Sequence, residues 1–217
     1  MKLLILADIH GCLDNLDYID AAIRECDGVV IAGDITDFGG DRQAGQILSA
    51  LGQYKKPLLA VPGNCDLAGV DKVLCQKGVG VHGTCVALNG LQFVGVGGSL
   101  PCPGATPNEA GEETFRRVLQ NAVVDLASKD NFVLVTHQPA WGTDLDTTGN
   151  GRHTGSQAVR EFIERYQPIL AISGHMHEAY GTDRLGATTL VNPGPFRQGR
   201  YAVVEIAEKQ VQVQLFP

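Results

Sequence analysis

The sequence predicts an α/β fold in which two mixed β-sheets pack face to face and are flanked by helices, a four-layer α/β/β/α sandwich. Its first third alternates apolar runs with helical patterns, which is typical of parallel strands joined by helices. Its last part holds short, closely spaced apolar runs, which are typical of antiparallel strands. Neither a low-complexity linker nor a fixed-period repeat divides the chain, so residues 1–217 are expected to form a single domain.

Three apolar runs in the first third, at residues 2–7, 29–32 and 57–61, are each short enough for a buried strand. Between them, apolar residues recur at helical spacing and predict two amphipathic helices. Their apolar faces hold Leu16, Ile19, Ile23 and Cys26 in the first helix, and Ala44, Ile47, Leu48 and Leu51 in the second. Asp41 is expected to cap the second helix and Gly52 to end it.

In the middle of the chain, short apolar runs at residues 79–88 and 91–96 flank Asn89-Gly90, a strong signal for a hairpin turn. A helix is then predicted over residues 112–128, because six apolar residues share one face. These are Phe115, Val118, Leu119, Ala122, Val123 and Leu126.

The last part of the chain begins with a long stretch without periodicity, at residues 138–155, which is typical of a functional or mobile loop. Thr154 and Gln157 have the spacing of a capping box and predict the start of the next helix. Strands are expected at residues 132–136, 168–173, 182–185, 188–192, 201–206 and 211–216.

The composition limits the classes of partner. A net charge of −7 argues against a protein that grips a nucleic-acid backbone, so no stable nucleic-acid binding is expected. No apolar run approaches the roughly 20 residues of a membrane span, and no membrane partner is expected. The six cysteines form no Cys-x-x-Cys pair and follow no secretory signal, which favours reduced thiols and a cytoplasmic protein.

Metal-ligating side chains stand where five apolar runs end. They are Asp8, His10, Asp34, Asn64, His137, His175 and His177. Ligands bind at the carboxyl ends of strands in open α/β sheets, so we expect these side chains to converge. Carboxylates, imidazoles and an amide oxygen suit divalent ions such as Mn, Fe, Co, Ni or Zn. One such residue alone is usually an ordinary cap or turn residue, but the five groups together predict a metal centre.

The ordered motifs closely resemble those of the calcineurin-like metallophosphoesterases. They are Asp8-x-His10, Gly33-Asp34-x-x-Asp37, Gly63-Asn64-x-Asp66, His137 and Gly174-His175-x-His177. The family's fold, two mixed sheets flanked by helices, agrees with the fold predicted above. The resemblance implies one ion on Asp8, His10 and His177, a second ion on Asn64, His137 and His175, and Asp34 as the bridge between them. Manganese is the expected metal, with Fe, Ni, Co or Zn as alternatives.

The resemblance also implies the chemistry. Two cations about 3.5–4 Å apart lower the pKa of a shared water, so that a hydroxide attacks phosphorus at neutral pH. Asp34 and Asn64 are therefore candidate catalytic residues as well as ligands. The expected enzyme is a metal-dependent phosphoesterase that hydrolyses a phosphodiester of a small molecule or nucleotide.

The sequence departs from the family pattern at Cys65, where many members have a histidine that meets the substrate. A thiol with a pKa near 8.5 is a poor acid for a leaving alkoxide and carries no positive charge. This version of the motif resembles that of a branch of small bacterial and archaeal phosphodiesterases. Arg152 and His153 precede a predicted helix N-terminus and are candidate catalytic residues that contact the substrate phosphate. The alternative is that both are solvated loop residues.

Other functions stay open on the same fold. One alternative is a phosphomonoesterase or a phosphoprotein phosphatase, although the arginine and histidine signatures of the latter are not seen. Another is a metal-binding scaffold without catalysis, which the complete set of ligands disfavours. A homo-oligomer is an expectation from the resemblance alone.

Overall fold

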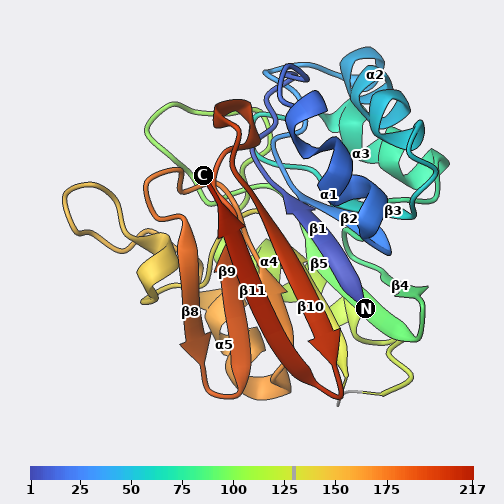
Figure 1. The fold of residues 1–217 in the computed structure, drawn as a ribbon. Helices are drawn as coiled ribbons and strands as arrows, with labels where there is room; N and C mark the ends of the chain where they lie inside the picture. Colours follow the sequence, from blue (N-terminus) through green and yellow to red (C-terminus); the bar gives the residue numbers. More distant parts are fainter. Residues whose placement is uncertain (129–130) are drawn as a thin grey trace.

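The computed structural model describes residues 1–128 and 131–217 and confirms two mixed β-sheets between layers of helices (Figure 1). In chain order the elements are β1 (Lys2–Leu6), η1 (Asp17–Ile19), α1 (Asp20–Glu25), β2 (Gly28–Ala32), α2 (Asp41–Gly52), β3 (Leu58–Val61), α3 (Ala68–Gln76), β4 (Cys85–Leu88), β5 (Leu91–Val96), α4 (Glu112–Ala122), β6 (Phe132–Thr136), η2 (Asp144–Asp146), α5 (Gln157–Tyr166), β7 (Leu170–Ile172), β8 (Gly181–Leu185), β9 (Thr188–Asn192), η3 (Phe196–Gln198), β10 (Tyr201–Ala207) and β11 (Gln210–Phe216). None of the described helices is long and apolar enough to cross a membrane.

The first sheet has the order β11-β10-β1-β2-β3 in the described chain. Strands β1, β2 and β3 are parallel, which confirms the predicted β-α-β-α-β pattern of the first third. Strand β10 joins β1 antiparallel, with Leu3 opposite Val204, and β11 continues the sheet antiparallel to β10. Figure 1 shows the consequence, in which the first strand of the chain lies beside one of the last.

The second sheet has the order β4-β5-β6-β7-β9-β8 in the described chain, with parallel strands in its middle and an antiparallel strand at each edge. The hairpin predicted at Asn89-Gly90 joins β4 to β5, and both turn residues have a positive φ, 49° and 84°. Strand β4 begins later than predicted because residues 79–81 instead bond to Ala60 at the edge of β3.

Alternating burial on the strands makes the four layers. In β1, Leu3 and Ile5 belong to the core between the two sheets. Their neighbours Leu4 and Leu6 face the opposite way and pack in the core beneath α1 and α2. Successive side chains of a strand point to opposite faces, so a strand buried on both faces reads as a continuous apolar run. A third core lies between the outer face of the second sheet and helices α4 and α5.

Helices α2, α3 and α4 depart from what the sequence predicts. Asp41 is the first residue of α2 instead of its cap, which is Gly40. Helix α4 ends at Ala122 and not at residue 128, although Val123 still packs in the core beneath α4. Helix α3 was not predicted, since it buries only Val70 and Leu74 and so gives a weak periodic signal. Apolar periodicity therefore reports burial more reliably than it reports the ends of a helix.

The capping box predicted at Thr154 is wrong, because Ser156 is the N-cap of α5. Its hydroxyl accepts a hydrogen bond from Val159 N at 3.2 Å. The carboxylate of Glu112, at the start of α4, accepts bonds from Gln157 N at 2.8 Å and Ala158 N at 2.9 Å. The free N–H groups of the first turn of α5 are thus satisfied largely from another helix.

We predict that Glu112→Ala lowers the free energy of unfolding by about 1–2 kcal/mol, the usual effect of losing a helix cap. Urea unfolding measures the change. Glu113→Ala is the matched control, because Glu113 occupies the same first turn of α4 and its side chain is 89% exposed. Equal stabilities of the two variants would contradict the role given to Glu112.

Candidate metal centre

The seven predicted metal ligands lie together at the carboxyl ends of parallel strands. Asp8 follows β1, Asp34 follows β2 and Asn64 follows β3 in the first sheet. His137 follows β6 and His175 follows β7 in the second sheet. The two sheets face each other, so their strand ends deliver carboxylates and the amide from one side and imidazoles from the other.

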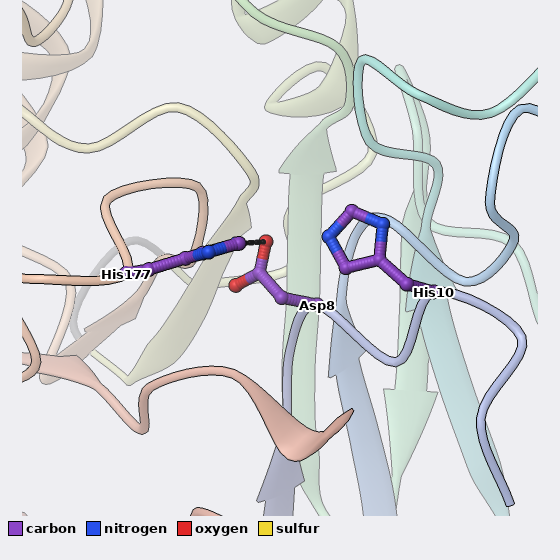
Figure 2. Close-up of side chains that lie close together, drawn as sticks. All are labelled: Asp8, His10 and His177. Carbon is purple, nitrogen blue, oxygen red and sulfur yellow. Dashed lines mark ion pairs between the residues drawn. The ribbon is translucent and has the colours of Figure 1, made fainter. Parts of the chain in front are cut away.

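One group of ligand atoms comes from Asp8, His10 and His177, whose nitrogen and oxygen atoms lie within 4.8 Å of one another. Figure 2 shows the carboxylate of Asp8 between the two imidazole rings. Nε2 of His177 lies 3.2 Å from Oδ1 of Asp8, and the two ring centroids are 5.6 Å apart.

The second group comprises Asn64, His137 and His175. His137 is fully buried, and its Nε2 lies 2.9 Å from Oδ1 of Asn64. Its Nδ1 lies 2.8 Å from the carbonyl oxygen of Ala32, which can only accept, so Nδ1 carries a hydrogen. Nε2 then faces acceptor oxygens alone, which suits either a second proton or a metal ion. The His175 ring lies beside it, with 5.1 Å between ring centroids.

Asp34 lies between the two groups. Its Oδ2 is 3.6 Å from Nε2 of His10, and its Oδ1 is 3.4 Å from Nε2 of His137. Oδ1 also accepts a hydrogen bond from Cys65 N at 2.8 Å. The two oxygens of one carboxylate thus face two different sets of ligands, which is the arrangement a bridging carboxylate needs.

The charges of this buried cluster depend on one another. Burial opposes ionisation of Asp34, but the charge of His137 and the hydrogen bonds from His137 and Cys65 outweigh it, and the pKa of Asp34 lies well below its usual range. Burial alone would lower the pKa of His137, whereas the charge of Asp34 raises it to about 9. Burial and the neighbouring His137 lower the pKa of His175 to about 4. Asp34 therefore stays a carboxylate, as a metal ligand must.

The residues fit divalent cations. Both ring nitrogens of His10 are buried and lack a hydrogen-bond partner among the described residues. Such orphaned atoms are rare in proteins unless they have a ligand. Metal–ligand bonds of about 2.1 Å place adjacent ligand atoms about 3.0–3.4 Å apart. Four ligand pairs across the cluster lie 2.9, 3.2, 3.4 and 3.6 Å apart, close to that range.

The backbone that carries the ligands is strained. Asp8, His10, Asp34 and His175 all have a positive φ, between 47° and 68°, which side chains with a Cβ seldom adopt. Asp8 N bonds to Gly33 O and His10 N to Asp34 O, so the first two ligand loops hold each other in this conformation. Strain of this kind collects at functional sites, where surrounding contacts enforce it.

Asp66 supports these loops, a role that the sequence did not reveal. Its buried carboxylate accepts hydrogen bonds from the backbone N–H groups of Ile35 at 3.1 Å, Thr36 at 2.7 Å and Gly63 at 2.7 Å. It therefore ties the Asp34 loop to the Asn64 loop. Gly63 is a local partner, but Ile35 and Thr36 lie 31 and 30 residues away, so no local pattern in the sequence indicates these bonds.

A cavity of about 450 Å³ adjoins the centre at His175. Its lining includes Leu100, Pro103, Gln138, Arg152, His175 and Met176. Gln138 holds two of its walls together, because its Oε1 accepts from Leu100 N at 3.0 Å and its Nε2 donates to Thr154 O at 2.9 Å. Of the two candidate phosphate contacts, Arg152 is therefore brought to the cavity beside the centre.

His153 is placed differently. Its Nδ1 lies 2.6 Å from Oδ1 of Asp146, and its ring lies 6.0 Å from the ring of Trp141. It is not among the described residues that line the cavity. Arg197 is a cation that the sequence did not single out. Its backbone N–H donates to Asp8 O at 3.3 Å, and the charge of its side chain acts with burial to lower the pKa of His10. Its place near the centre follows from the packing of η3 against the Asp8 loop, which the sequence does not indicate.

The sequence of this chain is similar to a known family and to known proteins. A family model described as calcineurin-like phosphoesterase matches residues 1–179. An uncharacterized protein of Methanocaldococcus jannaschii is 34% identical over 203 residues, which cover 90% of this chain and 88% of that protein. A UPF0046 protein of Caenorhabditis elegans is 27% identical over 215 residues, covering 92% and 71%.

Two solved structures share the fold. A protein of Thermus thermophilus superposes with a TM-score of 0.74 at 19% identity, covering 98% of this chain and 97% of that one. A structure described as a novel archaeal phosphodiesterase superposes with a TM-score of 0.56 at 16% identity and covers all of both chains.

We predict that Gly33→Ala lowers both the stability of the protein and its affinity for metal. Gly33 has a φ of 87°, and a Cβ there would lie 2.7 Å from Cβ of His137. The variant is expected to lose about 2 kcal/mol or more of stability and to bind metal at least tenfold more weakly. Urea unfolding and titration calorimetry measure both effects.

Gly45→Ala is the control for that variant. Gly45 lies inside α2, and a Cβ there would meet nothing within 4 Å. This change is expected to raise stability by up to about 1 kcal/mol, because alanine favours the helix, and to leave metal binding unchanged. A Gly33→Ala protein that bound metal like the wild type would contradict the prediction, because His137 would then have moved without a loss of metal affinity.

Proposed function

The chain belongs to the calcineurin-like phosphoesterase family, and we propose that it is a dinuclear-metal-dependent phosphodiesterase acting on a small molecule or nucleotide. Membership of the family supports a hydrolase that acts on phosphate esters and uses divalent metal ions. The observation that carries the dinuclear proposal is the position of Asp34, whose two oxygens face two separate groups of ligands.

The proposed ligands follow the two groups. Asp8, His10 and His177 would hold one ion, Asn64, His137 and His175 the other, and Asp34 both. Manganese is the proposed metal, with Fe, Ni, Co and Zn as alternatives for this mixture of oxygen and nitrogen donors. Two such ions would supply a water of lowered pKa and neutralise the charge of the phosphate oxygens.

The chain's own residues favour a diester. Burial and the nearby Asp34 raise the pKa of Cys65 far above its usual range, so it stays a neutral thiol. It cannot readily protonate a poor leaving group, which favours esters whose leaving group departs as a stable anion. Arg152 lines the cavity beside His175 and would contact the substrate phosphate, and we propose the same contact for His153. All six cysteines are free thiols, which supports a cytoplasmic location.

The first test is hydrolysis of bis-p-nitrophenyl phosphate by metal-stripped protein after Mn, Fe, Ni, Co, Zn or Mg is added back singly. We expect a transition metal to restore activity. Asp34→Asn should lower kcat/KM at least a hundredfold and reduce the bound metal, because the amide removes the bridging charge. Asp17→Asn, at an exposed aspartate of η1, is the control and should match the wild type.

An Asp34→Asn variant with activity and metal content near wild type would end the bridging assignment. A p-nitrophenyl phosphate assay alongside distinguishes a diesterase from a monoesterase. A wild-type protein that binds two ions but hydrolyses neither ester would instead be a metal-binding scaffold.

The phosphate contacts are tested by Arg152→Ala and His153→Ala. Loss of a hydrogen bond from a charged group should lower kcat/KM on the diester about tenfold or more, with metal content unchanged. Arg117→Ala, at an exposed arginine of α4, is the control for removing a positive charge. If His153→Ala stayed within about twofold of wild type, His153 would have no role in substrate binding.

A further inference from the structure

The amide of Asn64 must point in one direction to serve as a metal ligand, because only its oxygen can bind the ion. The side chain is buried, with Oδ1 2.9 Å from Nε2 of His137. Its Nδ2 lies 3.1 Å from Oγ1 of Thr106, on the opposite side of the amide. A reversed amide would turn its NH₂ group toward the centre. Nδ2 also lies 3.6 Å from Sγ of Cys65, which is a weak acceptor, so Thr106 is the stronger of its two partners. The bond to Thr106 therefore largely decides whether the oxygen of the amide faces the metal.

Glu109 fixes the direction of the hydrogen bond between Thr106 and Asn64. Its Oε1 lies 2.7 Å from both the hydroxyl and the backbone nitrogen of Thr106, and 2.9 Å from the Cys102 thiol. Hydrogen bonds from Cys102 and Thr106 hold the pKa of Glu109 at about 2, so it only accepts at neutral pH. The single hydrogen of the Thr106 hydroxyl then goes to Glu109, and its lone pairs face Asn64. Asn64 must donate to it.

The loop that carries Thr106 is also held in place by hydrogen bonds that do not involve the Thr106 hydroxyl. Asn108 N donates to Asn64 O at 3.0 Å, and Asn108 Nδ2 donates to Gly63 O at 2.9 Å. These bonds hold the loop against the Asn64 segment through the side chain and backbone of another residue. Removal of the Thr106 hydroxyl should therefore change the orientation of the amide while leaving the loop in place.

We propose that Thr106 is a positioning residue of the metal centre, which together with Glu109 fixes the Asn64 amide with its oxygen toward the ion. The inference rests on the proposed function, in that it takes Asn64 as a ligand. Partners of this kind, which hold a ligand without touching the metal, typically change metal affinity 10–100-fold.

The test compares Thr106→Val, which keeps the shape and loses the hydroxyl, with Thr106→Ser, which keeps the hydroxyl. Metal-stripped full-length proteins are titrated with Mn²⁺ and Co²⁺ by calorimetry. Thr106→Val should weaken one ion at least tenfold, and Thr106→Ser should stay within about threefold of wild type. Glu109→Gln should weaken the binding of the same ion. The NH₂ group of glutamine can donate to the Thr106 hydroxyl, whose hydrogen would then be free to point toward Asn64. Thr182→Val, on the exposed part of β8, is the control.

Wild-type affinity in Thr106→Val would overturn the proposal, and so would an equal loss in Thr106→Val and Thr106→Ser, since packing alone would then explain it. Weaker binding of both ions together with a lowered Tm would mean a structural role, which also overturns it. A wild-type protein that binds ions but hydrolyses no ester would end the proposed function and leave the Thr106 result standing. A wild-type protein that binds no ion would overturn both.

Discussion

The buried carboxylate of Asp34 is the group on which the rest of the centre depends. It lies between His10 at 3.6 Å and His137 at 3.4 Å, and it belongs to a loop that contacts three other ligand loops. A carboxylate is costly to bury unless positive charge or donors surround it. The histidines, the N–H of Cys65 and the proposed cations supply that compensation. Both sheets must therefore close before Asp34 has a favourable environment.

The backbone is strained at four of the proposed ligands, Asp8, His10, Asp34 and His175. The compensation comes from rigid surroundings. The ligand loops bond to one another, Asp66 joins two of them, and the strands behind them are buried on both faces. Local conformations that would be unstable in isolation thus persist because the double-sheet core leaves the loops little room to relax.

The cavity differs from the candidate metal centre in its construction. The proposed metal ligands follow strands, whereas the walls of the cavity are loops near Leu100 and Thr154 that Gln138 joins. Gln138 directly follows His137, a proposed ligand, so one strand end positions both a residue of the candidate centre and the cavity wall. The loop from Cys102 to Asn108 contributes Cys102 and Pro103 to the cavity lining, and its Thr106 accepts a hydrogen bond from Asn64. A change in this part of the cavity wall would therefore reach Asn64, a proposed metal ligand.

The β-α-β-α-β pattern of the first third, the hairpin at Asn89-Gly90 and the seven residues that gather at one place could be predicted from the sequence, because they depend on local periodicity and on residue type at strand ends. Four features depend on tertiary packing and could not be predicted: the cap of α5, the end of α4, the partners of Asp66 and the placement of Arg152 at the cavity. Glu112 caps a helix 45 residues away, and Thr106 meets Asn64 across 42 residues. Hydrogen-bond partners so distant leave no local pattern, since their meeting depends on how the layers pack.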